Sequence, residues 1–274
     1  MNFLFRSAAC LALALPIASL SAQSFSNFTG LGTLGGDASY AYGINNAGLI
    51  VGESYLSADT NLRAFSYTGG VMTNLGVLGG GAAAGSSAYG LNNSGLIVGV
   101  SSTTSFNPHA FSYTGGVMSD LGGTVSRANA VNNGGTVVGQ AQSPNGAEAF
   151  YYSGGTINLM GTLGGFYSEA RGINTSGLIV GDSEIDESGA TVHAFSYTGG
   201  TMSDLGTLGG FSSTALAVNT AGQIVGSSTI AAEAATHAFF YNGGAMHDLG
   251  TLGGVSSYAY GINSLGQIVG QSYT

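Results

Sequence analysis

The sequence predicts an all-β chain folded as a six-bladed β-propeller, a ring of four-stranded antiparallel sheets. The first observation is a set of short motifs that recurs in a fixed order, most cleanly from His193 to Gly226. Such a period is typical of repeat architectures. The second is its length, because successive Val-Gly motifs lie 47, 40, 42, 45 and 44 residues apart, which matches one propeller blade. The third is composition: 49 glycines and 6% charged residues indicate many tight turns.

Each repeat contains a predicted hairpin built around an asparagine. A strand of alternating small residues ends at the asparagine, and after two spacer residues a glycine precedes the motif Ile/Val-Val-Gly, which begins the next strand. The asparagine side chain can cap a type I turn, and the glycine can take the left-handed conformation. The six asparagines are Asn45, Asn92, Asn132, Asn174, Asn219 and Asn263.

A second predicted hairpin follows in each repeat. The motif Ala-Phe-x-Tyr is followed by Gly-Gly, and then by a strand that we expect to contain Leu-Gly-Thr-Leu-Gly-Gly. Both central residues of the favoured two-residue turn need a positive φ, which glycine supplies. The first glycines of these pairs are Gly69, Gly115, Gly154, Gly199 and Gly243. The two hairpins together predict one four-stranded antiparallel blade per repeat.

The motif count predicts how the ring closes. Six asparagine hairpins are present but only five clear Ala-Phe strands, and Ser24 to Gly30 can serve as a degenerate sixth. We therefore expect the N-terminal hairpin, residues 23–36, to join the last strands, from Gly261 to Ser272, and to leave no long exposed sheet edge. An open β-solenoid is the alternative architecture.

The N-terminus predicts a secretory signal peptide over residues 1–22. Arg6 precedes an apolar run from Ala8 to Leu20, with small residues around Ala22. The run is shorter than the ~20 residues that a membrane-spanning helix needs, so no membrane span is expected. Residues 23–274 would then form a single domain of six repeats, secreted or periplasmic.

Charge and missing motifs exclude several functions. The mature chain has three arginines and no lysine against 13 acidic residues, a net charge of −10, which is unsuited to nucleic acid. No Gly-x-Ser-x-Gly, Gly-Lys-Ser/Thr or His-Glu-x-x-His motif occurs. The chain is therefore predicted not to be an enzyme, and no cofactor is expected. A propeller hydrolase or lyase using Asp182, His193 or Asp248 is a less favoured alternative.

Variable positions on the asparagine strand indicate a candidate ligand-binding site. In a propeller the inner strands open at a central channel, and tyrosines there offer flat faces and hydroxyls suited to sugars or peptides. We therefore predict a secreted binding protein for a surface glycan or protein. The alternatives are that the tyrosines pack between blades, or that the protein is a structural matrix component without a discrete ligand. The candidates are Tyr40, Tyr42, Tyr89, Tyr258 and Tyr260.

Two further patterns could suggest metal binding. Asp182, Glu184 and Asp186 have the spacing of the first three ligands of a calcium loop, but the glycine at position six is missing and His193 stands in place of the closing glutamate. This is a weak candidate, and no metal site is predicted. The recurrent histidines His109, His193 and His237 should lie on separate blades, so they are expected to be structural.

The motifs DLGTLGG, AxGIN, GxIVG and HAFxY together resemble the HAF family of extracellular bacterial repeats, named for His-Ala-Phe as at 193–195. The resemblance covers nearly the whole mature chain. It implies export from a bacterium and no established biochemical activity. Two features depart from the family pattern: Arg63 and Glu148 replace the histidine in two repeats, and no sorting tail follows Thr274. The second feature suggests either simple secretion or a truncated gene.

Overall fold

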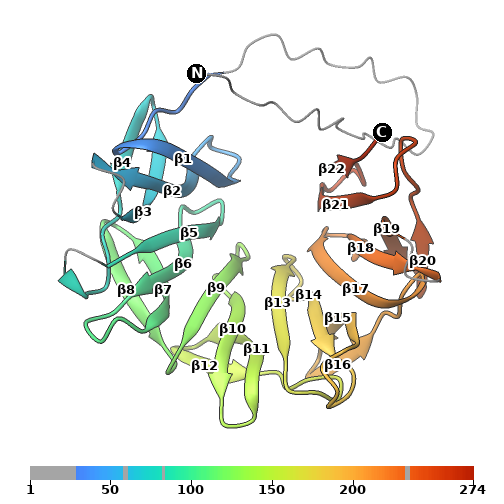
Figure 1. Ribbon diagram of the computed structural model, residues 1–274. Coiled ribbons are helices and arrows are strands. Elements are labelled where there is room, and N and C mark those ends of the chain that lie inside the picture. The colour runs from blue at the N-terminus through green and yellow to red at the C-terminus, as the bar shows by residue number, and fades with distance from the viewer. Residues whose placement is uncertain (1–28, 58–60, 82–83, 232–234) are drawn as a thin grey trace. The chain divides into compact units, whose positions relative to one another are not determined.

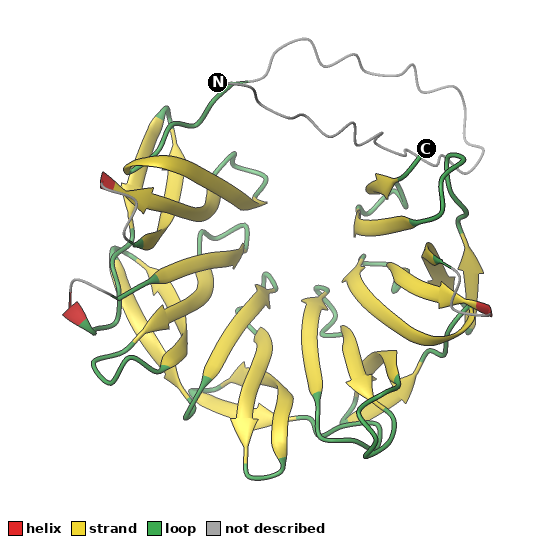
Figure 2. Ribbon diagram, in the orientation of Figure 1, coloured by secondary structure: helices red, strands yellow, loops and turns green. Residues whose placement is uncertain are grey.

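The computed structural model describes residues 29–57, 61–81, 84–231 and 235–274, and strands make up most of these ranges (Figure 2). The all-β prediction is therefore confirmed. Within the described ranges, no helix is long and apolar enough to cross a membrane. The chain divides into two compact units, one ending at Met160 and the other beginning at Gly161.

The unit that ends at Met160 contains three four-stranded antiparallel sheets (Figure 1). The first comprises β1 (Gly35–Ile44), β2 (Ile50–Leu56), β3 (Leu62–Thr68) and β4 (Val71–Asn74). The second comprises β5 (Ser86–Leu91), β6 (Ile97–Ser102), β7 (Pro108–Thr114) and β8 (Val117–Gly122). The third comprises β9 (Ser126–Val131), β10 (Val137–Ser143), β11 (Gly146–Ser153) and β12 (Thr156–Leu159).

The unit that begins at Gly161 repeats this plan. Its first sheet comprises β13 (Ser168–Ile173), β14 (Ile179–Glu184), β15 (Val192–Thr198) and β16 (Thr201–Asp204). Its second comprises β17 (Gly209–Val218), β18 (Ile224–Ile230), β19 (Thr236–Asn242) and β20 (Ala245–Asp248). One parallel pair, Val192 with Ser212, connects these two sheets. The last sheet contains β21 (Ser257–Ile262) and β22 (Ile268–Ser272).

The strand order within the five complete sheets follows the sequence, so the predicted antiparallel blade is confirmed. The assignment of Leu-Gly-Thr-Leu-Gly-Gly to a strand was wrong in part. In the first sheet β4 ends before Leu75, whose N–H adds one last bond to the Ala64 carbonyl at 2.9 Å. The chain then turns at Gly76, where φ is +83°, and the Leu78 N–H donates to Ser101 in the next sheet. The motif therefore mainly links neighbouring sheets.

The asparagine turn has the predicted form. In the first sheet the Gly48 N–H donates to the Asn45 carbonyl at 3.0 Å, and Gly48 has φ of +78°. The Asn45 Oδ1 accepts from the N–H groups of Ala47 and Leu49, both at 3.0 Å. The side chain thus satisfies backbone donors that the short turn leaves without a ladder partner.

The Gly-Gly turns are also confirmed. Gly69 and Gly70 have φ of +58° and +85°, and the flanking residues Thr68 and Val71 are paired in the ladder. The other four Gly-Gly pairs have similarly positive φ values. These values are those of the primed two-residue turn that matches the twist of antiparallel strands.

The glycine that ends Ile/Val-Val-Gly makes room inside each blade. In the first sheet the β1–β2 register shifts between Ala41 and Gly43, forming a bulge. A methyl group on Gly52 would overlap the Tyr40 carbonyl oxygen and lie 2.9 Å from the ring of Phe65. Phe65 is completely buried, as is its counterpart in each of the other complete sheets. The glycine and the phenylalanine therefore fit one another as a cross-strand pair.

Neighbouring sheets within a unit pack through apolar residues and through a chain of asparagines. Val51 of the first sheet packs in one cluster with Ile97 and Phe111 of the second. The Asn45 Nδ2 donates to the Asn92 carbonyl at 3.1 Å, and the Asn92 Nδ2 donates to the Asn132 carbonyl at 3.0 Å. The corresponding bonds in the other unit run from Asn174 to Asn219 to Asn263, at 2.9 and 3.0 Å. We call this chain of bonds the asparagine ladder.

The predicted signal peptide and residues 23–28 of the predicted closing hairpin lie outside the described residues, which begin at residue 29. Within the described part, Leu34 and Gly35 both pair with Leu56, so this segment runs directly into β1.

Candidate functional site

The variable face of each blade is formed by three positions from two strands. In the first sheet Tyr40 and Tyr42 belong to β1, and Glu53, which follows the Val-Gly of β2, pairs opposite Tyr40. The Tyr42 hydroxyl donates to Glu53 Oε1 at 2.7 Å. This third position was not predicted from the sequence, although its residue also changes from repeat to repeat: Glu53, Val100, Gln140, Asp182, Ser227 and Gln271.

Three of the five predicted tyrosines lie in the unit that ends at Met160. The rings of Tyr42 and Tyr89 are 5.7 Å apart between centroids and inclined at 54°, so the first and second sheets share an aromatic contact. Tyr40 and Tyr42 are both about half exposed, at 49% and 48%. Partial burial and the hydrogen bond to Glu53 raise the pKa of Tyr42 above its ordinary value, so its hydroxyl keeps its proton to a higher pH than that of a free tyrosine.

The other two predicted tyrosines lie in the unit that begins at Gly161. The rings of Tyr258 and Tyr260 are stacked, with centroids 6.4 Å apart and planes 5° apart. The Tyr260 hydroxyl donates to Gln271 Oε1 at 3.1 Å, which repeats the bond from Tyr42 to Glu53. The structure thus arranges the predicted residues as two aromatic groups, each described within its own unit.

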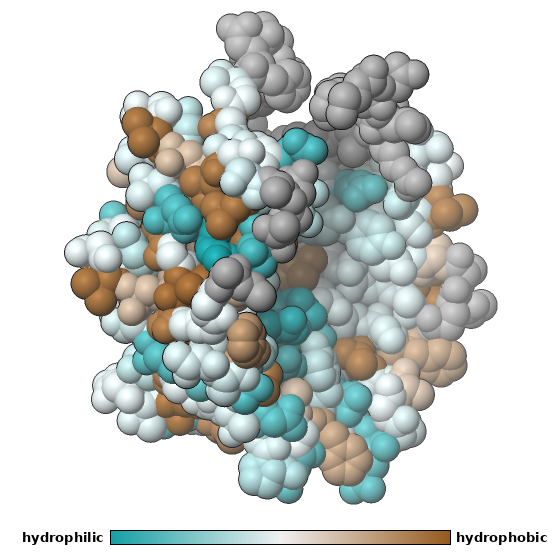
Figure 3. Space-filling view, turned by 60° about the vertical axis from the view of Figure 1, so that its left-hand side comes forward, coloured by the Kyte–Doolittle hydropathy of each residue, from teal (hydrophilic) through white to brown (hydrophobic). Residues whose placement is uncertain are grey.

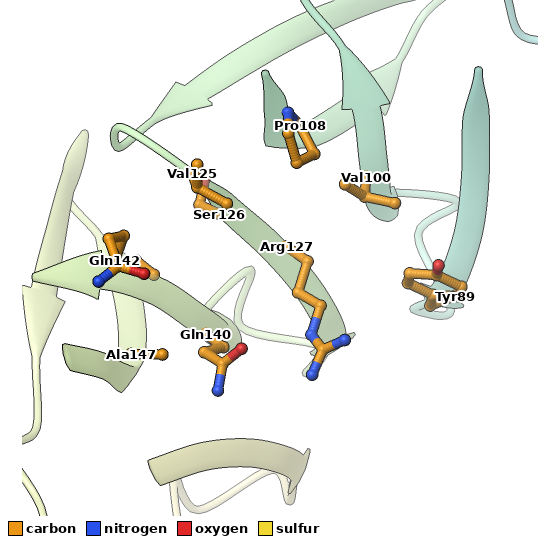
Figure 4. A pocket seen from close by; sticks show the side chains of 10 residues that line it. Tyr89, Val100, Pro108, Val125, Ser126, Arg127, Gln140, Gln142 and Ala147 are labelled. Atoms are coloured by element: carbon orange, nitrogen blue, oxygen red, sulfur yellow. The ribbon is translucent and has the colours of Figure 1, made fainter. Parts of the chain in front are cut away.

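A cavity of about 280 Å³ lies between the second and third sheets (Figure 4). Tyr89 is part of its wall, so the cavity adjoins the aromatic contact between Tyr42 and Tyr89. The sequence analysis did not predict it. The lining residues are Tyr89, Val100, Pro108, Val125, Ser126, Arg127, Gln140, Ala141, Gln142 and Ala147.

The two interfaces differ at equivalent positions. Between the first and second sheets, the long side chain of Glu53 reaches across and accepts a hydrogen bond from the Ser87 hydroxyl. Val100 is the residue of the second sheet equivalent to Glu53, and Arg127 is the residue of the third equivalent to Ser87. Valine is too short to bridge, so the space between these two sheets stays open.

The polar groups of the cavity come mainly from the third sheet. Arg127 and Gln140 are directly opposite one another in the β9–β10 ladder, and Figure 4 shows both side chains extending from that sheet with their head groups close together. The Gln142 amide nitrogen donates to the Gly146 carbonyl at 3.0 Å, which fixes the orientation of that amide. Val100 and Pro108 provide apolar surface from the second sheet.

The carboxylates of the weak calcium candidate have separate partners. Asp182 is paired with Arg171, Glu184 Oε2 accepts the Phe166 N–H at 2.8 Å, and Asp186 accepts from Ser188. Among the residues that the structure describes, no group of three or more histidine, cysteine, aspartate or glutamate side chains could hold a metal ion. The calcium-like spacing therefore does not form a common ligand set here.

In the fourth sheet the variable face is occupied by paired charges. Arg171 bonds Asp182 and lies 2.8 Å from Glu169, and the Tyr167 hydroxyl donates to Glu169 at 2.9 Å. Both carboxylates are almost fully buried. Burial by itself lowers the pKa of Arg171, but the hydrogen bond and charge of Asp182 outweigh it, so the net shift is upward. This network fills the positions that form the aromatic face in the first sheet.

The recurrent histidines pair with aspartates of their own sheets. The Nδ1–Oδ2 distances are 2.9 Å for His109 with Asp120, 2.8 Å for His193 with Asp204 and 2.8 Å for His237 with Asp248. Each aspartate also accepts the N–H of the glycine two residues on. Where the histidine is replaced, by Arg63 and Glu148, the aspartate is replaced too, by Asn74 and Leu159. The histidine and the aspartate are therefore present or replaced together, and where present they join the third and fourth strands of one sheet.

Comparisons with known proteins support the fold. Neither a comparison with protein-family models nor one with curated proteins finds a match. The solved structure of TolB from Acinetobacter baumannii is similar, with a TM-score of 0.50 and 13% sequence identity. The match covers 82% of this chain and 64% of the TolB chain. A mutant of AofleA from Arthrobotrys oligospora gives a TM-score of 0.44 and 11% identity, covering 79% of this chain and 73% of that chain.

The likeness to TolB is one of fold, at an identity too low to carry function. With the four-stranded antiparallel sheets, it identifies this chain as an all-β protein of the propeller-like class.

Proposed function

We propose that this chain is a secreted, non-enzymatic binding protein and that its ligand is an extracellular glycan. The observation that carries the proposal is the cavity between the second and third sheets, which opens beside the aromatic pair Tyr42 and Tyr89. A half-exposed aromatic ring beside a small concave site with amide groups is suited to a sugar, because the ring covers the C–H face and the amides bond the hydroxyls.

The size and surface of the molecule favour a small recognition element. The cavity volume of about 280 Å³ is near the lower end of ligand pockets. On the face shown in Figure 3, hydrophobic side chains lie in small groups separated by pale and hydrophilic residues. A protein partner that needs a large apolar surface would find little of it on that face. Export rests on the N-terminal pattern and on the resemblance to the HAF repeats.

Binding would be tested by calorimetric titration of the mature chain with a panel of neutral and acidic oligosaccharides. We expect the double variant Tyr42→Ala, Tyr89→Ala to weaken binding at least about tenfold, because aromatic contacts contribute about 1 kcal/mol or more beyond their buried area. The unfolding temperature should change little, since Tyr42 is half exposed. The matched control is Phe166→Ala, an aromatic 51% exposed in the other unit.

Unchanged affinity in the double variant would refute this site. Failure of every sugar to bind, together with a large loss of stability in the double variant, would favour the structural alternative, in which these tyrosines only pack the sheets.

We also propose that the propeller has six blades and that the N-terminal segment completes the last one. The β21–β22 sheet has two strands where the others have four. Val269 of β22 is 53% exposed, whereas Val51 at the equivalent position is fully buried. A sixth blade completed by the preceding Ala-Phe-like segment would explain why the repeat begins and ends with half a unit.

Hydrogen exchange would test this closure. Replacing residues 24–30 by a glycine and serine segment of equal length should abolish protection of the amides of Ile268–Ser272 while leaving β10 protected, because only the last blade loses strands. Equal protection of β22 in both proteins would show that the segment is not part of that blade.

A further inference from the structure

The cavity between the second and third sheets contains one of the few positive charges of the chain. The mature chain has three arginines against 13 acidic residues. Arg63 donates to the carbonyls of Leu62 and Ala84, and Arg171 is bound by Asp182 and Glu169. Arg127 is exposed and lines the cavity. A cation thus stands in the one cavity described above, within an otherwise acidic protein.

The cavity is also asymmetric. Arg127 and Gln140 present their head groups from one wall, and Gln142 adds an amide whose nitrogen is held by Gly146. Val100 and Pro108 of the second sheet give apolar surface, and Tyr89 gives an aromatic ring. A ligand that fits this arrangement needs an anionic group at one end, hydroxyls, and a C–H face.

We propose that this cavity binds a carboxylate-bearing sugar, such as a uronic acid residue of a glycan, and that Arg127 holds the carboxylate. The guanidinium group is planar and can donate two parallel hydrogen bonds to a carboxylate, which gives orientation as well as attraction. Gln140 and Gln142 are placed to bond the ring hydroxyls. This inference rests on the proposed function, because it names the class of glycan that the same site takes.

Differences between the repeats confine the expected selectivity for carboxylates to this cavity. At the equivalent cleft between the first and second sheets, Glu53 stands where the cavity has Val100, and Ser87 stands where it has Arg127. A carboxylate ligand would meet a carboxylate there instead of a guanidinium group. The same comparison shows how to block the cavity: Val100→Glu should reach Arg127 as Glu53 reaches Ser87, and so occupy the site with an internal anion.

The test is a calorimetric titration of the mature chain with glucuronate and galacturonate oligosaccharides, and with neutral glucose and galactose oligosaccharides of equal length. We expect the acidic sugars to bind at least about tenfold more tightly in low salt, and added salt to reduce the difference. Arg127→Gln should remove this preference while leaving the weaker binding of neutral sugars. Arg127→Lys should keep part of this preference, because lysine keeps the positive charge but lacks the planar guanidinium group that donates two parallel hydrogen bonds. Val100→Glu should abolish acidic-sugar binding.

The outcomes separate the two proposals. Equal affinity for acidic and neutral sugars, unaffected by Arg127→Gln, would overturn the carboxylate inference and leave the glycan-binding function standing. Binding of peptides with a free C-terminal carboxylate in place of any sugar would overturn the choice of ligand class and the glycan proposal together. If the Tyr42, Tyr89 double variant also binds as well as the original chain, the site itself is wrong. Unfolding curves of Arg127→Gln and Val100→Glu would verify that both variants are folded.

Discussion

Replacing Gly99 by alanine is expected to lower the free energy of unfolding by about 3 kcal/mol or more. A methyl group there would overlap the Ser87 carbonyl oxygen and lie 2.9 Å from both the Ala88 Cα and the Phe111 ring. Two of these neighbours are backbone atoms of a bulged strand, and Phe111 is completely buried. None can move without breaking ladder bonds or core packing.

Gly85→Ala is the matched control for this prediction. Gly85 directly precedes β5, the strand that contains Ser87 and Ala88. A methyl group on Gly85 would have its nearest neighbour at an ordinary 3.7 Å. Equilibrium unfolding in urea would compare the two variants. Similar midpoints for Gly99→Ala and Gly85→Ala would mean that the bulge can relax, contrary to the packing described above.

Replacing Asn92 by alanine should have the next largest effect, a loss of about 2 to 3 kcal/mol, because buried backbone groups lose their partners. Asn92 is 5% exposed. Its Oδ1 accepts from the N–H groups of Leu96 and Ser94 at 3.0 and 3.1 Å, and its Nδ2 donates to the Asn132 carbonyl at 3.0 Å. The side chain thus supports its own turn and contacts the next sheet.

Asn92→Asp separates these two roles. Aspartate keeps an oxygen that can accept from Leu96 and Ser94, but it replaces the donor to Asn132 by an oxygen that faces the Asn132 carbonyl. Its loss in stability should therefore combine the lost contact between sheets with the cost of burying a carboxylate. Asn93→Ala, at an exposed neighbour whose Oδ1 accepts one N–H from Asn46, should cost less than about 1 kcal/mol. In urea unfolding, Asn92→Ala and Asn93→Ala curves that coincide would contradict the importance of the asparagine ladder.

The turns could be predicted from the sequence because their chemistry is local. Asn45 and Gly48 define a turn within four residues, and Gly69 with Gly70 defines another. The Leu-Gly motif was assigned to a strand because it follows the Gly-Gly turn, which indicates a hairpin. What makes it a link is a contact distant in sequence, from Leu78 to Ser101 of the next sheet. Periodicity alone does not contain that information.

The candidate site could be predicted only in part. Variation within the repeat drew attention to the face that carries Tyr42 and Tyr89, whose rings lie 5.7 Å apart between centroids. That this face binds a ligand stays a prediction. The cavity depends on the difference between Glu53 and Val100, which matters only once neighbouring sheets are packed. A search for residues that change together would have found the histidine–aspartate pairs, since His109 and Asp120 are separated by 11 residues and the other two pairs have the same spacing.

The asparagine ladder has a consequence for how such a chain can lengthen. Asn92 provides a carbonyl to the repeat before it and an amide to the repeat after it, and Asn219 does the same in the other unit. These two repeats therefore carry both the acceptor and the donor of one type of contact. A tandem duplication of either repeat would insert a copy with a matching donor and acceptor at its two ends. Gain or loss of whole repeats by unequal recombination therefore requires no new type of contact between sheets.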